Sequence, residues 1–190
     1  MFRNALILFS LLVLILVLSA QQSMDFYPPS LKKELQKTDS TTTKLNELIL
    51  SDNARSQVPM GNYFTVANTD SQFVYIGRVN ACRAGGCEDP SIADAFGETF
   101  EYFDYYILFD SSYTVMDVKV YNYQATHGQE ISSKNWLKQF RHYDGSKKLV
   151  TGKNIDGISG ATISVEAIVY DIEHKTNLLR EVVPNQSRSN

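Results

Sequence analysis

Apolar and polar residues alternate most clearly between residues 99 and 122. The stretch 99–109 is dense in aromatic residues, and residues 110–112 have the composition of a turn. In 114–122, every second side chain is apolar: Met116, Val118 and Val120 alternate with Asp117 and Lys119. A period of two places one side of a strand against a core and the other side in water. The pattern predicts two strands joined by a short turn.

Shorter patterns of the same kind precede this region. Pro28-Pro29 should stop any earlier element, and a short polar helix is expected over Ser30–Gln36, followed by a polar break. Residues 45–50 fit a helical turn and a strand equally well. Residues 63–66 and 73–79 flank the turn-rich Asn68-Thr69-Asp70, which predicts a hairpin.

Beyond residue 134 the period becomes helical. We expect a short helix over Asn135–Phe140, a turn over 142–148, a short strand over 148–150 and a long helix from Thr162. Strands packed on one long C-terminal helix predict an α+β fold, an antiparallel β-sheet with flanking helices. On that helix the predicted apolar side holds Ala161, Val165, Ile168, Ile172 and Leu179, and the predicted polar side holds Glu166, Asp171, Glu173 and Lys175.

The N-terminus has the pattern of a targeting segment. Arg3 is followed by an apolar run over Ala5–Leu18 and by Ser19-Ala20. This order predicts a signal peptide over residues 1–20, cleaved after Ala20. The run is shorter than the ~20 apolar residues that span a bilayer comfortably. An uncleaved N-terminal membrane anchor is the alternative.

Charge and cysteine content narrow the function. The 190 residues carry a net charge of −3, with interspersed charges and no long basic cluster, which disfavours nucleic-acid binding. Three histidines without ligand spacing and two cysteines are too few for a metal or iron–sulfur site. In an exported protein, Cys82 and Cys87 are expected to form a structural disulfide. A redox-active pair is the alternative.

A glycine- and hydroxyl-rich heptad directly precedes the long helix. It reads Asp156-Gly157-Ile158-Ser159-Gly160-Ala161-Thr162. Ser159 or Thr162 is expected to cap the helix, and the helix N-terminus favours a phosphate group. Gly157 and Gly160 allow close approach of a ligand. The charge of Asp156 would repel an anion, so we expect this residue to cap the turn or to engage a modifying enzyme and its metal. The alternative is a capped helix after a glycine turn, with no ligand.

The heptad resembles the D-x-x-S-G-A-T signature of FMN-binding domains, in which a flavin transferase joins FMN to the final threonine through a phosphoester. The resemblance extends over about residues 70–172 and includes Trp136–Phe140. Many members have an E-T-x-G stretch followed by a helix ending in Q-F. Here Gln124-Ala125-Thr126-His127-Gly128 departs from that stretch, because no glutamate precedes the threonine.

The N-terminal pattern and the resemblance together predict a signal peptide or membrane anchor over 1–20, a linker and N-terminal extension over 21–60, an FMN-binding domain over 61–182 and a tail over 183–190. The resemblance implies that Thr162 carries FMN and that Thr126 and Gly128 line the flavin. A strand-end turn is the alternative for Thr126 and His127. The residues expected around the cofactor are Asp156, Ser159, Gly160, Ala161, Thr162, Thr126 and Gly128.

The same resemblance implies a function. Relatives include the flavin subunits of sodium-pumping NADH:quinone reductases and of ferredoxin-linked Rnf-type complexes. The chain is therefore expected to be an electron-transfer flavoprotein in the periplasm or on the outer face of the cytoplasmic membrane. Its expected partners are a flavin transferase and a membrane redox complex or a soluble redox protein. Two alternatives are a flavin-dependent oxidoreductase with its own small-molecule substrate and a non-redox exported binding module. We find no constellation of acid, base and nucleophile, which favours a carrier over a stand-alone enzyme.

Overall fold

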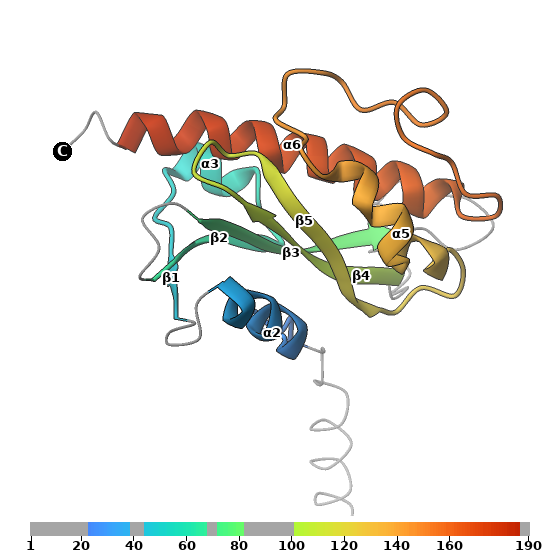
Figure 1. Ribbon diagram of the computed structural model, residues 1–190, viewed down its shortest axis with the longest axis horizontal. Helices are drawn as coiled ribbons and strands as arrows, with labels where there is room; N and C mark the ends of the chain where they lie inside the picture. The colour runs from blue at the N-terminus through green and yellow to red at the C-terminus, as the bar shows by residue number, and fades with distance from the viewer. Residues whose placement is uncertain (1–22, 39–43, 68–71, 82–100, 187–190) are drawn as a thin grey trace, which may run out of the picture.

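The computed structural model describes residues 23–38, 44–67, 72–81 and 101–186. Within them lies a five-stranded antiparallel sheet in which each strand pairs with the next along the chain. The predicted α+β fold with flanking helices is confirmed (Figure 1). The strands are β1 (Leu45–Glu47), β2 (Gly61–Val66), β3 (Phe73–Ala81), β4 (Glu101–Phe109) and β5 (Val115–Tyr123). The helices are α2 (Pro29–Thr38), α3 (Asp52–Ser56), η1 (Gln129–Ser132), α5 (Lys134–Leu137), η2 (Lys138–Phe140) and α6 (Thr162–Gln186).

The predicted strands before and after residues 110–112 are β4 and β5. They pair in register at Ile107 and Val118. The expected burial of Met116 is wrong: this residue is 41% exposed, because it is an extra residue between the pairs Leu108–Asp117 and Phe109–Val115, and Val115 is buried instead. The carboxylate of Asp110 closes the turn by accepting hydrogen bonds from the backbone N–H groups of Ser112 at 2.8 Å and Thr114 at 3.0 Å. Aspartate favours such turns because its short side chain can replace a backbone acceptor.

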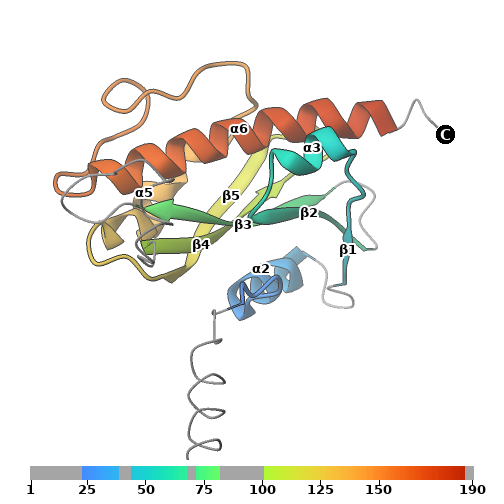
Figure 2. The ribbon, with the colours of Figure 1, turned by 180° about the vertical axis from the view of Figure 1, so that it is seen from behind.

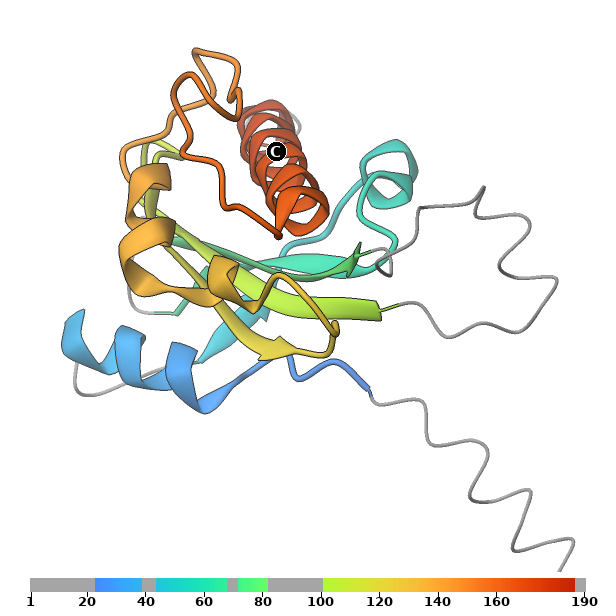
Figure 3. The same ribbon diagram turned by 90° about the vertical axis from the view of Figure 1, so that its right-hand side faces the viewer.

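Helix α6 lies along one face of the sheet and forms the main core with it. The predicted apolar stripe is confirmed, since Val165, Ile168, Ile172 and Leu179 are completely buried. One residue of the predicted polar side is misplaced: Lys175 is only 6% exposed and points into the core. The view along α6 in Figure 3 shows α6 and α2 on opposite faces of the sheet.

Helix α2 covers the second face of the sheet. Leu31 and Leu35 pack there with Val74, Ile76 and Tyr106 in a smaller core. The short helix expected over Ser30–Gln36 is therefore confirmed and buries its apolar side. Residues 45–50 form a strand at their start, β1, which pairs with β2. Figure 2 shows α3 on the same side of the sheet as α6.

Two expectations near the heptad need correction. Residues 148–150 do not form a strand but enter a turn, in which the carbonyl of Val150 accepts from the N–H groups of Lys153 and Asn154, each at 3.1 Å. The turn forms because the side chain of Asn154 also accepts from the N–H of Val150, at 2.7 Å. The expected helix over Asn135–Phe140 is divided into α5 and the 3-10 helix η2.

Three sequence predictions lie outside the described residues: the signal or anchor over 1–20, the turn Asn68-Thr69-Asp70 and the Cys82–Cys87 disulfide. In the described part of the chain, no helix combines the length and apolar character needed to cross a membrane.

Candidate functional site

The heptad ends in a tight turn that starts α6. The N–H of Ala161 donates to the carbonyl of Ile158 at 3.1 Å, and the N–H of Val165 donates to the carbonyl of Ala161 at 2.9 Å. Gly160 has a φ of 81° and occupies the third position of this turn, where a positive φ favours glycine. Thr162, the first residue of α6, is exposed.

Among the described residues, no side chain accepts from the first N–H groups of α6. Ala161 stands at the cap position, which corrects the expectation that Ser159 or Thr162 caps the helix. Alanine has no side-chain acceptor to offer the first N–H groups. In the described part of the chain, no group accepts from the backbone N–H of Thr162, Ile163 or Ser164. The exposed hydroxyl of Thr162 therefore lies at a helix end with free donors, which suits an anionic group.

Side chains from the short helices hold the start of the heptad. The indole N–H of Trp136 donates to the carbonyl of Asp156 at 2.8 Å, and the N–H of Asp156 donates to the side-chain oxygen of Gln139 at 2.7 Å. Ile155 is buried next to them. The backbone of Asp156 is thus fixed while the residue itself is exposed.

A β-bulge in β5 changes the direction of the side chains that precede Gln124–Gly128, the other segment predicted to contact the flavin. Tyr105 pairs with Val120 and Asp104 pairs with Asn122, so Tyr121 is an extra residue in the ladder. Such a bulge shifts the following side chains to the other face of the sheet. Tyr121 consequently packs with the α2 core and Tyr123 with the α6 core.

Gln124–Gly128 follows β5, and its last residue packs directly on α6. Gly128 has a φ of 87°, and a Cβ added there would lie 2.6 Å from Oγ of Ser164 and 2.9 Å from the hydroxyl oxygen of Tyr123. Only glycine fits this approach. Thr126 and His127 are exposed, and the Thr126 hydroxyl donates to the carboxylate of Glu101. In the structure, Gly128 therefore contacts the first turn of α6, whereas Thr126 contacts Glu101, the first residue of β4.

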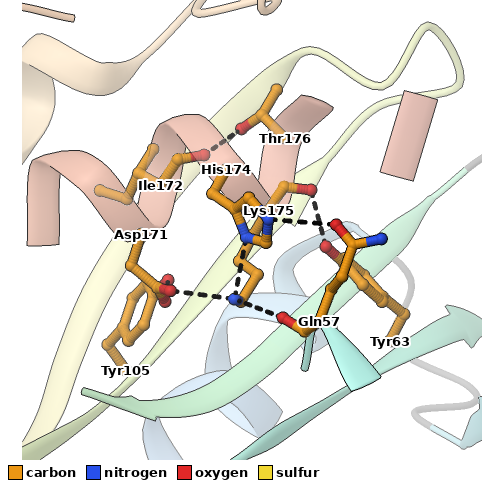
Figure 4. A network of polar contacts seen from close by, with 8 residues as sticks. All are labelled: Gln57, Tyr63, Tyr105, Asp171, Ile172, His174, Lys175 and Thr176. Atoms are coloured by element: carbon orange, nitrogen blue, oxygen red, sulfur yellow. Dashed lines mark hydrogen bonds and ion pairs between the residues drawn. The ribbon is translucent and has the colours of Figure 1, made fainter. Parts of the chain in front are cut away.

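The sequence analysis missed a buried polar network in the middle of α6 (Figure 4). The ammonium group of Lys175 lies 3.0 Å from the carboxylate of Asp171 and donates to the carbonyl of Gln57 at 3.0 Å. The Tyr105 hydroxyl donates to the same carboxylate at 2.5 Å. Burial, followed by the charge of Asp171, raises the pKa of Tyr105 well above its ordinary value. The spacing of Asp171 and Lys175, four residues apart on a helix, was the available signal.

This network fixes α6 on the sheet and α3. The hydroxyl of Tyr63 in β2 donates to the backbone carbonyl of Lys175 at 2.7 Å, and His174 contacts the side chain of Gln57 at 3.3 Å. These contacts come from three elements that are distant in sequence. In the described part of the chain, no cluster of three histidine, cysteine, aspartate or glutamate side chains could hold a metal ion.

The FMN-binding domain family model matches residues 103–173. The matched range starts in β4, includes Gln124–Gly128 and the whole heptad, and ends in the middle of α6. Residues 103–173 are thus similar to the FMN-binding domain family, and this match indicates FMN as the cofactor. No curated protein matches the chain.

The residues at the start of α6 fit a flavin phosphate. The N–H groups of Thr162, Ile163 and Ser164, which have no acceptor among the described residues, can donate to phosphate oxygens, and the helix dipole favours the negative charge. Among the described residues, apart from its neighbours in the chain, nothing lies within 4 Å of the position that a Cβ of Gly160 would occupy, so this turn leaves room for a ligand. Thr162 and the helix N–H groups would hold the phosphate end of FMN.

Proposed function

We propose that this protein is an extracytoplasmic electron-transfer flavoprotein whose FMN is attached through a phosphoester to Thr162. The observation that carries this proposal is the position of Thr162. It is exposed at the first residue of α6, beside N–H groups without an acceptor in the described residues, and it lies within the family match.

The attachment uses the chemistry of a hydroxyl and a phosphate ester. The new bond joins Oγ1 of Thr162 to phosphorus, the hydroxyl proton leaves, and the bond from phosphorus to a leaving group on an activated flavin nucleotide breaks with its electron pair. When bound, the flavin supplies the redox chemistry, and the protein supplies attachment and surroundings. The donors of Thr162, Ile163 and Ser164 would offset the phosphate charge.

Two features favour a carrier outside the cytoplasm. The signal pattern of residues 1–20 supports export. A covalent link retains a cofactor where free FMN would be scarce, and it leaves the ring edge open for exchange with a partner. We therefore propose a flavin transferase as the modifying partner and a membrane redox complex or soluble redox protein as the electron partner.

The test is intact-mass analysis after co-expression with a flavin transferase. The wild-type chain should carry one FMN adduct, and Thr162→Ala should carry none. Ser159→Ala is the matched control, because it removes the other exposed hydroxyl of the heptad and should retain the adduct. An unmodified wild-type chain, or an adduct that survives Thr162→Ala, would contradict the proposed linkage.

A further inference from the structure

Three segments meet at the hydroxyl group of Tyr123. This residue ends β5, and its hydroxyl donates to the backbone carbonyl of His127. The same oxygen lies 3.0 Å from Oγ of Ser164, in the first turn of α6. Ser164 is only 4% exposed and Tyr123 is half-buried, so this contact is partly shielded from water. The end of β5, the loop Gln124–Gly128 and the first turn of α6 therefore all contact one atom, the hydroxyl oxygen of Tyr123.

The directions of the two hydrogen bonds depend on each other. Tyrosine has one hydroxyl proton. Because Tyr123 donates it to His127, the Ser164 hydroxyl must donate to the Tyr123 oxygen. The ring is fixed as well, since it stacks on Phe103 with 5.7 Å between ring centroids and 7° between planes. The close approach of Gly128 to Ser164 leaves no space for the loop to shift inward.

The position of this contact connects the two parts of the flavin site. Ser164 lies two residues after Thr162 in the same helical turn, and His127-Gly128 ends the loop that the family match includes. We infer that Tyr123 is a positioning residue, which holds Gln124–Gly128 against the first turn of α6 and so keeps the ring of an FMN attached at Thr162 in one orientation. This inference rests on the proposed attachment site.

The chain offers a matched control two residues away. The hydroxyl of Tyr121 also donates to a backbone carbonyl, that of Asp25, at 2.7 Å. Tyr121 lies on the other face of the sheet because of the bulge. Tyr123→Phe and Tyr121→Phe each remove one hydroxyl from the same strand, but only the first should affect the flavin.

The first experiment measures time-resolved flavin fluorescence anisotropy of the flavinylated protein. Tyr123→Phe should carry one adduct, like the wild type, but shift the ratio of immobile to mobile flavin by at least about fivefold, the change that loss of one neutral hydrogen bond produces. Ser164→Ala removes only the hydrogen bond to the helix and should give a shift in the same direction that is no larger. The double variant should add little to Tyr123→Phe, because the Tyr123 hydroxyl takes part in both hydrogen bonds. Tyr121→Phe should match the wild type. Unchanged anisotropy in Tyr123→Phe with a full adduct would overturn the inference.

The second experiment needs no flavin. In the Thr162→Ala background, the amides to follow are those of Gln124, Ile131 and Val165, which donate to the carbonyls of Tyr102, Gly128 and Ala161. Their hydrogen exchange should be faster in Tyr123→Phe and Ser164→Ala than in Tyr121→Phe. Failure of the wild-type chain to accept FMN would contradict the proposed function and leave this comparison intact. Equal exchange in all three variants would overturn the positioning role even where the adduct forms.

Discussion

Polar groups lie in opposite environments in the middle and at the start of α6. In the middle of the helix, Lys175 is buried and contacts the side chain of Asp171 and the carbonyl of Gln57. At the start of the helix, Thr162 is exposed and the first N–H groups have no acceptor in the described residues. A buried charge is tolerated only when it is paired and hydrogen-bonded. The difference shows that the buried network stabilises the fold, and that the open start of the helix is the place where a bound ligand would form the most new hydrogen bonds.

The largest expected effect comes from breaking the buried pair. Asp171→Asn leaves the ammonium of Lys175 buried without its counter-charge and should lower the free energy of unfolding by about 3–5 kcal/mol. Urea denaturation would measure this. Glu166→Gln, on the exposed side of the same helix, should change it by no more than about 0.5 kcal/mol. A loss below about 1 kcal/mol in Asp171→Asn would show that the network does not hold α6 in place.

The next largest effect on stability is expected at Gly128, where the loop Gln124–Gly128 contacts the first turn of α6. Gly152 and Gly128 both have a positive φ, 79° and 87°, but nothing lies within 4 Å of an added Cβ at Gly152. Gly152→Ala should therefore lower the free energy of unfolding by about 1–2 kcal/mol through backbone strain alone. Gly128→Ala should lose about 1–3 kcal/mol more through the clash with Ser164. Equal losses in a thermal or urea titration would mean that the loop is free to move away.

Acid should weaken the buried region. Burial, followed by the positive charge of Lys175, lowers the pKa of His174 below its ordinary value. The unfolded chain then binds a proton more readily than the folded chain, so stability present above the unfolded pKa of ~6.5 falls as the pH drops through the folded pKa. The urea midpoint should decrease from pH 7 to pH 5. His174→Gln should reduce this decrease, whereas the exposed His127→Gln should leave it unchanged.

The smallest expected effect is on the stability of the open end. Thr162 is exposed and is the first residue of the helix, so the higher helix propensity of alanine should change the stability only slightly. Thr162→Ala should change the free energy of unfolding of the unmodified protein by less than about 0.5 kcal/mol. A larger loss in urea titration would indicate that the threonine has a structural role, and the contrast between the two parts of α6 would weaken.

Much of this architecture follows from local patterns. Alternation over 99–122 predicted β4 and β5, and the apolar stripe of α6 was read correctly at Val165, Ile168 and Ile172. The hydrophobic periodicity gave a wrong prediction at Lys175, because its burial depends on Asp171 and on the carbonyl of Gln57, the residue that follows α3. It also failed over 148–150, where Asn154 closes a turn that a run of apolar residues does not reveal.

By itself, the sequence determined the α+β class, the long helix and the heptad ending at Thr162, because each is encoded in neighbouring residues. Only the tertiary structure decided that Gly128 lies against Ser164 and that Tyr123 turns toward α6. The physical reason is the extra residue at Tyr121, which reverses the faces of β5 beyond it. Such a shift depends on the pairing of β5 with β4, so it cannot be predicted from the hydrophobic periodicity of β5 alone.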